Sequence, residues 1–130
     1  MDMGGRKVSK GVPSEEDFAR ASAAIKERSR GLSEVRQKIL DHFRSSGELH
    51  EFFILDCAER SFRAYVFYPR EKDVEMARKS GLESRVKDSV FKELANVGRG
   101  GRDTIEVKFE WDSHENVERH FEGNYFNRLR

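Results

Sequence analysis

Residues 51–68 have the sequence EFFILDCAERSFRAYVFY, and this stretch decides the fold. It contains two short runs rich in aromatic and β-branched residues, 51–57 and 61–68, which are typical of β-strands. The three residues between the runs suffice for a hairpin, although the Asn-Gly or Asp-Gly pair that fixes a turn type is absent. We therefore expect two adjacent antiparallel strands that end at Pro69, which cannot donate a backbone hydrogen bond to a sheet.

A third strand is expected at residues 105–111, where apolar and charged side chains alternate. Strict alternation predicts a strand with one buried face and one solvated face. Such half-exposed strands are typical of antiparallel sheets that helices cover on one side. The sequence therefore predicts an α+β fold with a three-stranded antiparallel sheet and helices packed mainly on one face.

Apolar residues at steps of three, four and seven predict a helical stripe over residues 14–46. An unbroken helix of that length would be roughly 50 Å long, whereas a compact domain of this size is only about 35 to 40 Å across. We expect a break near Gly31, with Ser33 capping a second helix; the alternative is a projecting helix that pairs with another copy. Further stripes predict helices at 70–80, at 82–97 and after a cap at Asp112 or Ser113. The expected order is α(α)ββα(α)βα.

Length and charge restrict the classes of function. The chain has 130 residues, which allows a single domain at 13–130 behind a flexible, basic, glycine-rich tail at 1–12. Its 25 Lys and Arg residues nearly cancel its 24 Asp and Glu residues, so no strong net field draws it to nucleic acid or to an anionic membrane. The single cysteine, Cys57, cannot form an internal disulfide, and no secretory or membrane-spanning segment is evident. We expect a cytoplasmic protein.

The second predicted strand carries aromatic residues on both faces. If Phe62 and its alternate neighbours face the helices, then Arg63, Tyr65 and Phe67 face the other way. Three arrangements would account for this second face. The segment 123–130 could cover it, a homodimer could bury it, or it could remain open for a partner or ligand.

Two further groups of residues suggest alternative functions. Arg99 and Arg102 lie among glycines, and with the basic tail residues Arg6, Lys7 and Lys10 they could contact nucleic acid. These glycines follow a predicted helix and lead into a strand, which is the reverse of a phosphate-binding loop.

An enzyme site around His114 or His120 is the other alternative. Their spacing of six residues sets them on different sides of a helix, so a shared metal is not expected. The sequence shows no pattern for a cofactor, and Cys57, at the end of an apolar strand, is expected to be a small buried hydrophobe.

Taken together, these features favour a small non-enzymatic protein-interaction module, such as an adaptor or an inhibitor of the kind that neutralises a toxin. The partner is expected to be a protein, including a second copy of the chain as a homodimer. Aromatic residues would supply buried area, and acidic residues would complement a basic partner. The expected partner-binding residues are Arg63, Tyr65, Phe67, Glu106, Glu110, Asp112 and Glu115.

Overall fold

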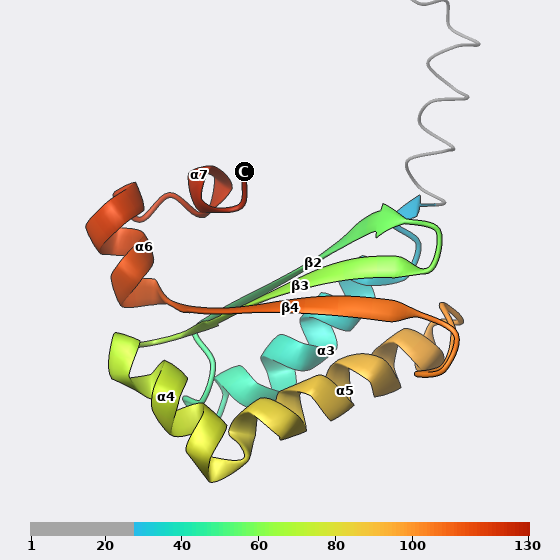
Figure 1. Ribbon diagram of the computed structural model, residues 1–130, viewed down its shortest axis with the longest axis horizontal. Coiled ribbons are helices and arrows are strands. Elements are labelled where there is room, and N and C mark those ends of the chain that lie inside the picture. Colours follow the sequence, from blue (N-terminus) through green and yellow to red (C-terminus); the bar gives the residue numbers. More distant parts are fainter. Residues whose placement is uncertain (1–27) are drawn as a thin grey trace, which may run out of the picture. The chain divides into compact units, whose positions relative to one another are not determined.

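The computed structural model describes residues 28–130, and Gly31–Arg130 form one compact unit (Figure 1). The expected tail at 1–12, the boundary at residue 13 and the first part of the helical stripe lie outside the described residues. The elements in chain order are α3 (Leu32–Arg44), β2 (Glu51–Ala58), β3 (Ser61–Tyr68), α4 (Glu71–Ser80), α5 (Leu82–Asn96), β4 (Glu106–Ser113), α6 (His114–Phe121) and α7 (Tyr125–Arg128). No helix in this part of the chain is long and apolar enough to cross a membrane.

The sheet has the strand order β2-β3-β4, and its first two strands form the expected antiparallel hairpin. Phe53 lies opposite Tyr65, and Glu51 lies opposite Phe67. At the turn, Arg60 adopts the left-handed conformation, with φ of 60°. A register shift between Asp56 and Ala58 absorbs an extra residue, as in a β-bulge. A turn of this kind explains how the hairpin closes without an Asn-Gly or Asp-Gly pair.

The third strand corrects one prediction, because β4 pairs with β3 in parallel and the sheet is mixed. Figure 1 shows why: α4 and α5 carry the chain back along the sheet, so that β4 begins beside the start of β3. Parallel strands need such a crossover, and two helices provide its length. The alternation of apolar and charged residues in β4 reflects its place at the sheet edge, not its direction.

Helices α3, α4 and α5 lie on one face of the sheet, as expected, and the main core fills the space between (Figure 1). The fully buried side chains of this core include Val35 and Phe43 from α3 and Val86 and Leu94 from α5. The predicted break near Gly31 is confirmed at the start of α3, but Gly31 itself, not Ser33, is the N-cap. Gly31 has φ of 77°, and a Cβ there would lie 2.7 Å from Cβ of Val97, so a side chain would fit neither the backbone nor the packing.

The short helices α6 and α7 lie on the opposite face of the sheet (Figure 1). The predicted cap of α6 is confirmed at Ser113, whose hydroxyl accepts a hydrogen bond of 3.0 Å from the Asn116 amide. After α6 the chain turns at Glu122 and Gly123, which both have positive φ, and returns over the sheet. Helices therefore cover both faces, three on one and two short ones on the other.

Candidate interaction surface

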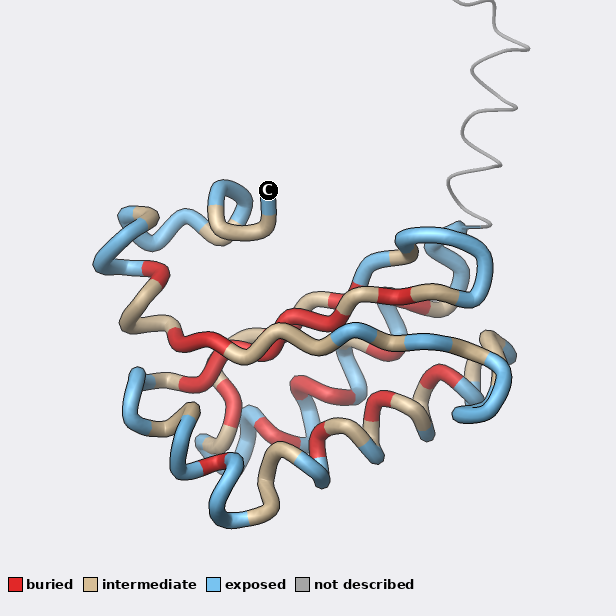
Figure 2. The backbone as a smooth tube through the Cα atoms, viewed as in Figure 1, coloured by how far each residue is buried: buried red, intermediate tan, exposed pale blue. Residues whose placement is uncertain are grey.

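The aromatic face predicted to bind a partner is buried by the protein itself. Tyr65 is 5% exposed and Phe67 is fully buried, in a second hydrophobic cluster with Val117 of α6. Figure 2 shows buried residues, in red, along the strands of the sheet. Phe62 faces the helices on the other side, so the predicted division of β3 between two faces is confirmed. Tyr65 and Phe67 are therefore not exposed in the described part of the chain, and their role in partner binding stays a prediction.

The predicted cover by the C-terminal segment is what buries this face. The ring of Tyr125 lies 4.8 Å from Phe67 and 5.6 Å from Phe53, centroid to centroid. Leu129 packs against the same cluster, whereas Phe126 points outward and is 71% exposed. Of the three arrangements that the sequence allowed, the chain folds back on its own sheet.

Two of the predicted acidic residues on β4, Glu110 and Asp112, form ion pairs with arginines of the same chain. Asp112 is nearly buried, and Oδ2 of its carboxylate accepts a hydrogen bond of 2.6 Å from Nε of Arg128. Burial acts to lower the pKa of the Arg128 guanidinium, but the hydrogen bond and charge of Asp112 outweigh it, so this pKa is raised. Glu110 lies 3.4 Å from Arg128 and 3.8 Å from Arg63. Glu110 and Asp112 thus fasten α7 to the sheet through Arg128, whereas Arg63 pairs with Glu110 across β3 and β4.

The other two predicted acids have different surroundings. Glu115 accepts a hydrogen bond of 2.8 Å from the Glu71 amide at the start of α4 and lies 3.6 Å from Arg119. Glu106 lies exposed at the first position of β4. A continuous acidic surface for a basic partner is therefore absent from this part of the protein, because Glu110, Asp112 and Glu115 have ionic partners within the described chain.

A cluster around His114 joins α6, α7 and the residue that precedes β2. Its Nδ1 lies 2.6 Å from the Tyr125 hydroxyl, and its Nε2 lies 3.6 Å from Glu118. The ring of His50 stacks on His114 at 3.8 Å between centroids. Burial, followed by the nearby His114 and Arg44, lowers the pKa of His50. Burial also raises the pKa of Tyr125, which keeps its hydroxyl protonated.

This cluster does not establish the enzyme alternative. His120 is exposed, and the Glu118 carboxylate lies at ion-pair distance from His114, beyond hydrogen-bond length. Among the described residues no group of His, Cys, Asp and Glu could hold a metal ion. Cys57 is exposed, contrary to expectation; it lies in β2 at the register shift between Asp56 and Ala58, where no residue of β3 is opposite it.

The structure separates the two arginines of the nucleic-acid alternative. Arg99 is nearly buried and lies 2.7 Å from Asp56, with its guanidinium 4.9 Å above the Phe62 ring. Arg102 is half-exposed, lies 2.9 Å from Asp88 and stacks on Phe91. Arg99 is thus committed to internal packing, and the basic residues of the tail lie outside the described part of the chain.

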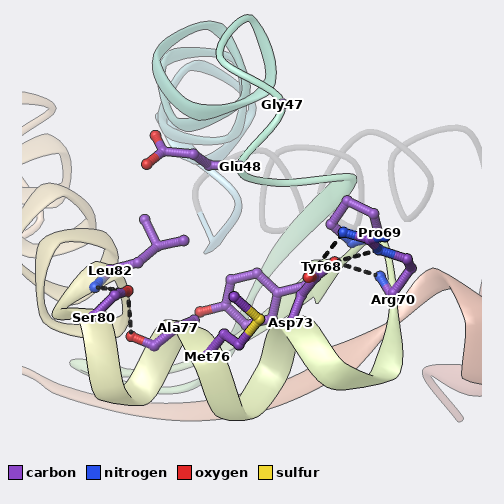
Figure 3. A pocket seen from close by; sticks show the side chains of 10 residues that line it. All are labelled: Gly47, Glu48, Tyr68, Pro69, Arg70, Asp73, Met76, Ala77, Ser80 and Leu82. Carbon is purple, nitrogen blue, oxygen red and sulfur yellow. Dashed lines mark hydrogen bonds and ion pairs between the residues drawn. The ribbon is translucent and has the colours of Figure 1, made fainter.

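A cleft of about 250 Å³ lies between the end of α3 and α4 (Figure 3). Gly47 and Glu48 line one side, and Met76, Ala77 and Leu82 line the other. The Tyr68 hydroxyl is buried near Ala77 without a hydrogen-bond partner among the described residues. Burial raises its pKa, so the group is a neutral donor. Because its oxygen is buried, this hydroxyl does not by itself define a ligand.

The outer edge of β4 is the surface that the sequence analysis missed. The Glu106 amide donates a hydrogen bond of 2.8 Å to the Arg60 carbonyl, so Glu106 directs its backbone groups towards β3. Backbone groups alternate in direction along a strand, and those of Val107, Phe109 and Trp111 therefore point away from β3. No described strand lies beyond them. Within residues 28–130, this row of backbone donors and acceptors has no strand to pair with.

The opposite edge of the sheet is protected in a way that β4 is not. Arg36 of α3 donates a hydrogen bond of 2.8 Å from Nε to the Phe52 carbonyl on the outer side of β2. Its guanidinium also bonds to Glu51 at 2.7 Å and lies 5.0 Å from the Phe53 ring. Natural proteins commonly block strand edges with charged side chains in this manner.

The side chains along the β4 edge are apolar and only half-buried. Phe109 and Trp111 stack with their centroids 5.3 Å apart, and Phe91 of α5 extends the row at 6.2 Å from Phe109. Lys87 lies 5.9 Å above both stacked rings. We name the outward backbone groups and half-buried side chains of Val107, Phe109 and Trp111 the β4 edge. The alternating pattern was the available signal in the sequence, but it does not reveal which strand lies outermost.

Comparison with protein-family models, with curated proteins and with solved structures gives no match to this chain.

Proposed function

We propose that this protein is a non-enzymatic protein-interaction module that binds an extended segment of its partner along the β4 edge. The unpaired backbone row of Val107, Phe109 and Trp111 supports this proposal most directly. Binding by strand addition draws its affinity from main-chain hydrogen bonds and its specificity from alternate side chains. An adaptor or an inhibitor could act in this way without catalysis.

The side chains of β4 define the chemistry of the partner segment. On the helix side, the half-buried rings of Phe109 and Trp111 favour apolar side chains at alternate positions of the added strand. On the other side, the exposed Glu106 and Lys108 and the half-exposed Glu110 present charges in the order acid, base, acid. The proposed partner segment therefore alternates apolar residues with charged residues, and its charges follow the order base, acid, base.

The experiment selects binding peptides from a random peptide-display library on the wild-type protein, with counter-selection on the Val107→Pro variant. Proline removes the outward amide of residue 107, and such a change is tolerated at a strand edge because no bond within the sheet is lost. We expect enriched peptides with alternating apolar residues, whose affinity falls at least tenfold for Val107→Pro. Backbone NMR shifts should concentrate on Val107, Phe109 and Trp111.

Val107→Ala is the matched control, since it shortens the same side chain and keeps the amide. The peptides should bind this variant within about threefold of wild type. Equal losses for the alanine and proline variants, or NMR shifts centred away from β4, would show that strand addition is not the mode of binding.

A further inference from the structure

We infer that the strand paired with the β4 edge is β4 of a second copy of this chain, in an antiparallel homodimer whose two-fold axis passes beside Phe109. This inference rests on the proposed function and names the occupant of the same edge. Such a dimer is isologous, because the same surface is used by both subunits. It joins two three-stranded sheets into one continuous sheet.

The backbone direction of β4 is compatible with this pairing. In an antiparallel ladder, residues with outward groups must face one another and exchange both hydrogen bonds. An axis beside Phe109 places this residue opposite Phe109 of the partner subunit, and Val107 opposite Trp111 of the partner subunit. Every outward residue of the β4 edge then meets another outward residue, and each outward group gains a partner.

Charge selects this register over its neighbours. With the axis beside Phe109, Lys108 faces Glu110 of the partner subunit, and symmetry repeats the pair. An axis shifted to Lys108 would place two lysines opposite each other and Glu106 opposite Glu110 of the partner subunit. In the chosen register Glu106 faces Asp112 of the partner subunit, but Arg128 already neutralises that carboxylate at 2.6 Å.

The apolar row is self-complementary in the same register. The two Phe109 rings lie side by side across the axis, and Trp111 lies beside Val107 of the partner subunit. These side chains are half-buried in the single chain, so pairing removes their remaining exposed surface from water. Phe91, which packs against Phe109 on the helix side, extends this contact from α5.

The test measures the mass of the full chain by light scattering over a dilution series, for wild type and two charge variants. Lys108→Glu places acids opposite each other in the dimer, and Glu110→Lys places bases opposite each other. We expect wild type to form a dimer. For each variant alone, the dissociation constant of the dimer should rise about tenfold or more. An equimolar mixture of the two variants should form a heterodimer, because the new Glu at position 108 of one variant then faces the new Lys at position 110 of the other, and Glu110 of the first faces Lys108 of the second.

Controls separate the dimer from folding and from the proposed function. Lys38→Glu, an exposed charge reversal on α3, should dimerise as wild type does, and far-UV circular dichroism should show that all variants fold. If the Glu110→Lys variant is unfolded, the Val107→Pro variant is used in its place. It should also dissociate the dimer, because proline removes the outward amide of residue 107. A wild-type monomer at all concentrations, or a dimer indifferent to Lys108→Glu, overturns this inference, while the peptide selection decides the proposed function independently.

Discussion

Asp112 is 8% exposed beneath α7, so its charge must be balanced inside the protein. Three donors surround its carboxylate: the Ser113 amide at 2.8 Å, the Asn116 side chain at 3.0 Å and the Arg128 guanidinium at 2.6 Å. The Arg128 guanidinium also lies 5.7 Å from the Phe67 ring. One arginine therefore neutralises a buried acid and covers an aromatic ring at the same time.

Replacing Arg128 should lower the free energy of unfolding far more than replacing Arg130. Arg128→Met should lower the free energy of unfolding by about 2 kcal/mol, because Asp112 keeps its buried charge and loses its cation. Arg130→Met is the matched control: Arg130 is exposed and lies 5.3 Å from the exposed Phe126 ring, a contact of about 0.5 kcal/mol. Urea denaturation at pH 7 measures both. Similar losses for the two variants would contradict the role given to Arg128.

Among the elements, α6 and α7 are fastened to the sheet at a stack of two histidines. His50, directly before β2, lies against His114 of α6, and His114 in turn contacts Tyr125 of α7. The groups that act on His50 come from three elements: His114 and Arg44 oppose its protonation, while Glu51 and Glu118 favour it. Burial, His114 and Arg44 together prevail, and the pKa of His50 lies below its ordinary 6.5.

Acidification should therefore weaken the protein through His50. In the unfolded chain, His50 binds a proton near pH 6.5, whereas in the folded chain it binds one only at lower pH. The contribution of neutral His50 to the free energy of unfolding is therefore complete above pH 6.5 and is lost as the pH falls towards the lowered pKa. We expect the melting temperature to fall between pH 7.5 and about 5, with a smaller fall for His50→Gln. The exposed His120→Gln should keep the full fall. An NMR titration that placed the pKa of His50 at or above 6.5 would refute this expectation.

The elements themselves were largely predictable from the sequence, because each depends on local patterns. Aromatic and β-branched runs predicted β2 and β3, and apolar stripes predicted α4 and α5 almost to the residue. The parallel direction of β4 was not predictable in this way. It depends on where α4 and α5 return the chain, and alternating side chains are compatible with either direction.

For the whole molecule, the sequence does not reveal which surfaces are covered by segments that are distant in the chain. The division of Phe62 and Tyr65 between two faces followed from strand geometry. That Tyr65 is covered by α7, and that Phe109 lies at an open edge, depends on how the last residues fold back and on strand order. A pattern of residue types shows that a surface can bind, but not whether the chain has already occupied it.

Removing the cover should therefore restore the surface that the sequence suggested. In a chain ending at Glu122, Phe53 and Phe67 lose Tyr125 and Leu129, which should cost about 3 to 5 kcal/mol of stability. The core under α3, α4 and α5 does not use the removed segment, so far-UV circular dichroism should persist while binding of a hydrophobic dye rises.

Phe126→Ala in the complete chain is the control for this truncation, since this ring is 71% exposed and should change neither signal. Loss of the dichroism would mean that the core on the helix side cannot hold the sheet alone, and unchanged dye binding would mean that the second cluster stays closed without α7. The expected result leaves Arg63, Tyr65 and Phe67 open on one side of the sheet. In the complete chain Tyr65 and Phe67 are buried beneath this cover, and the β4 edge is where we propose that a partner binds.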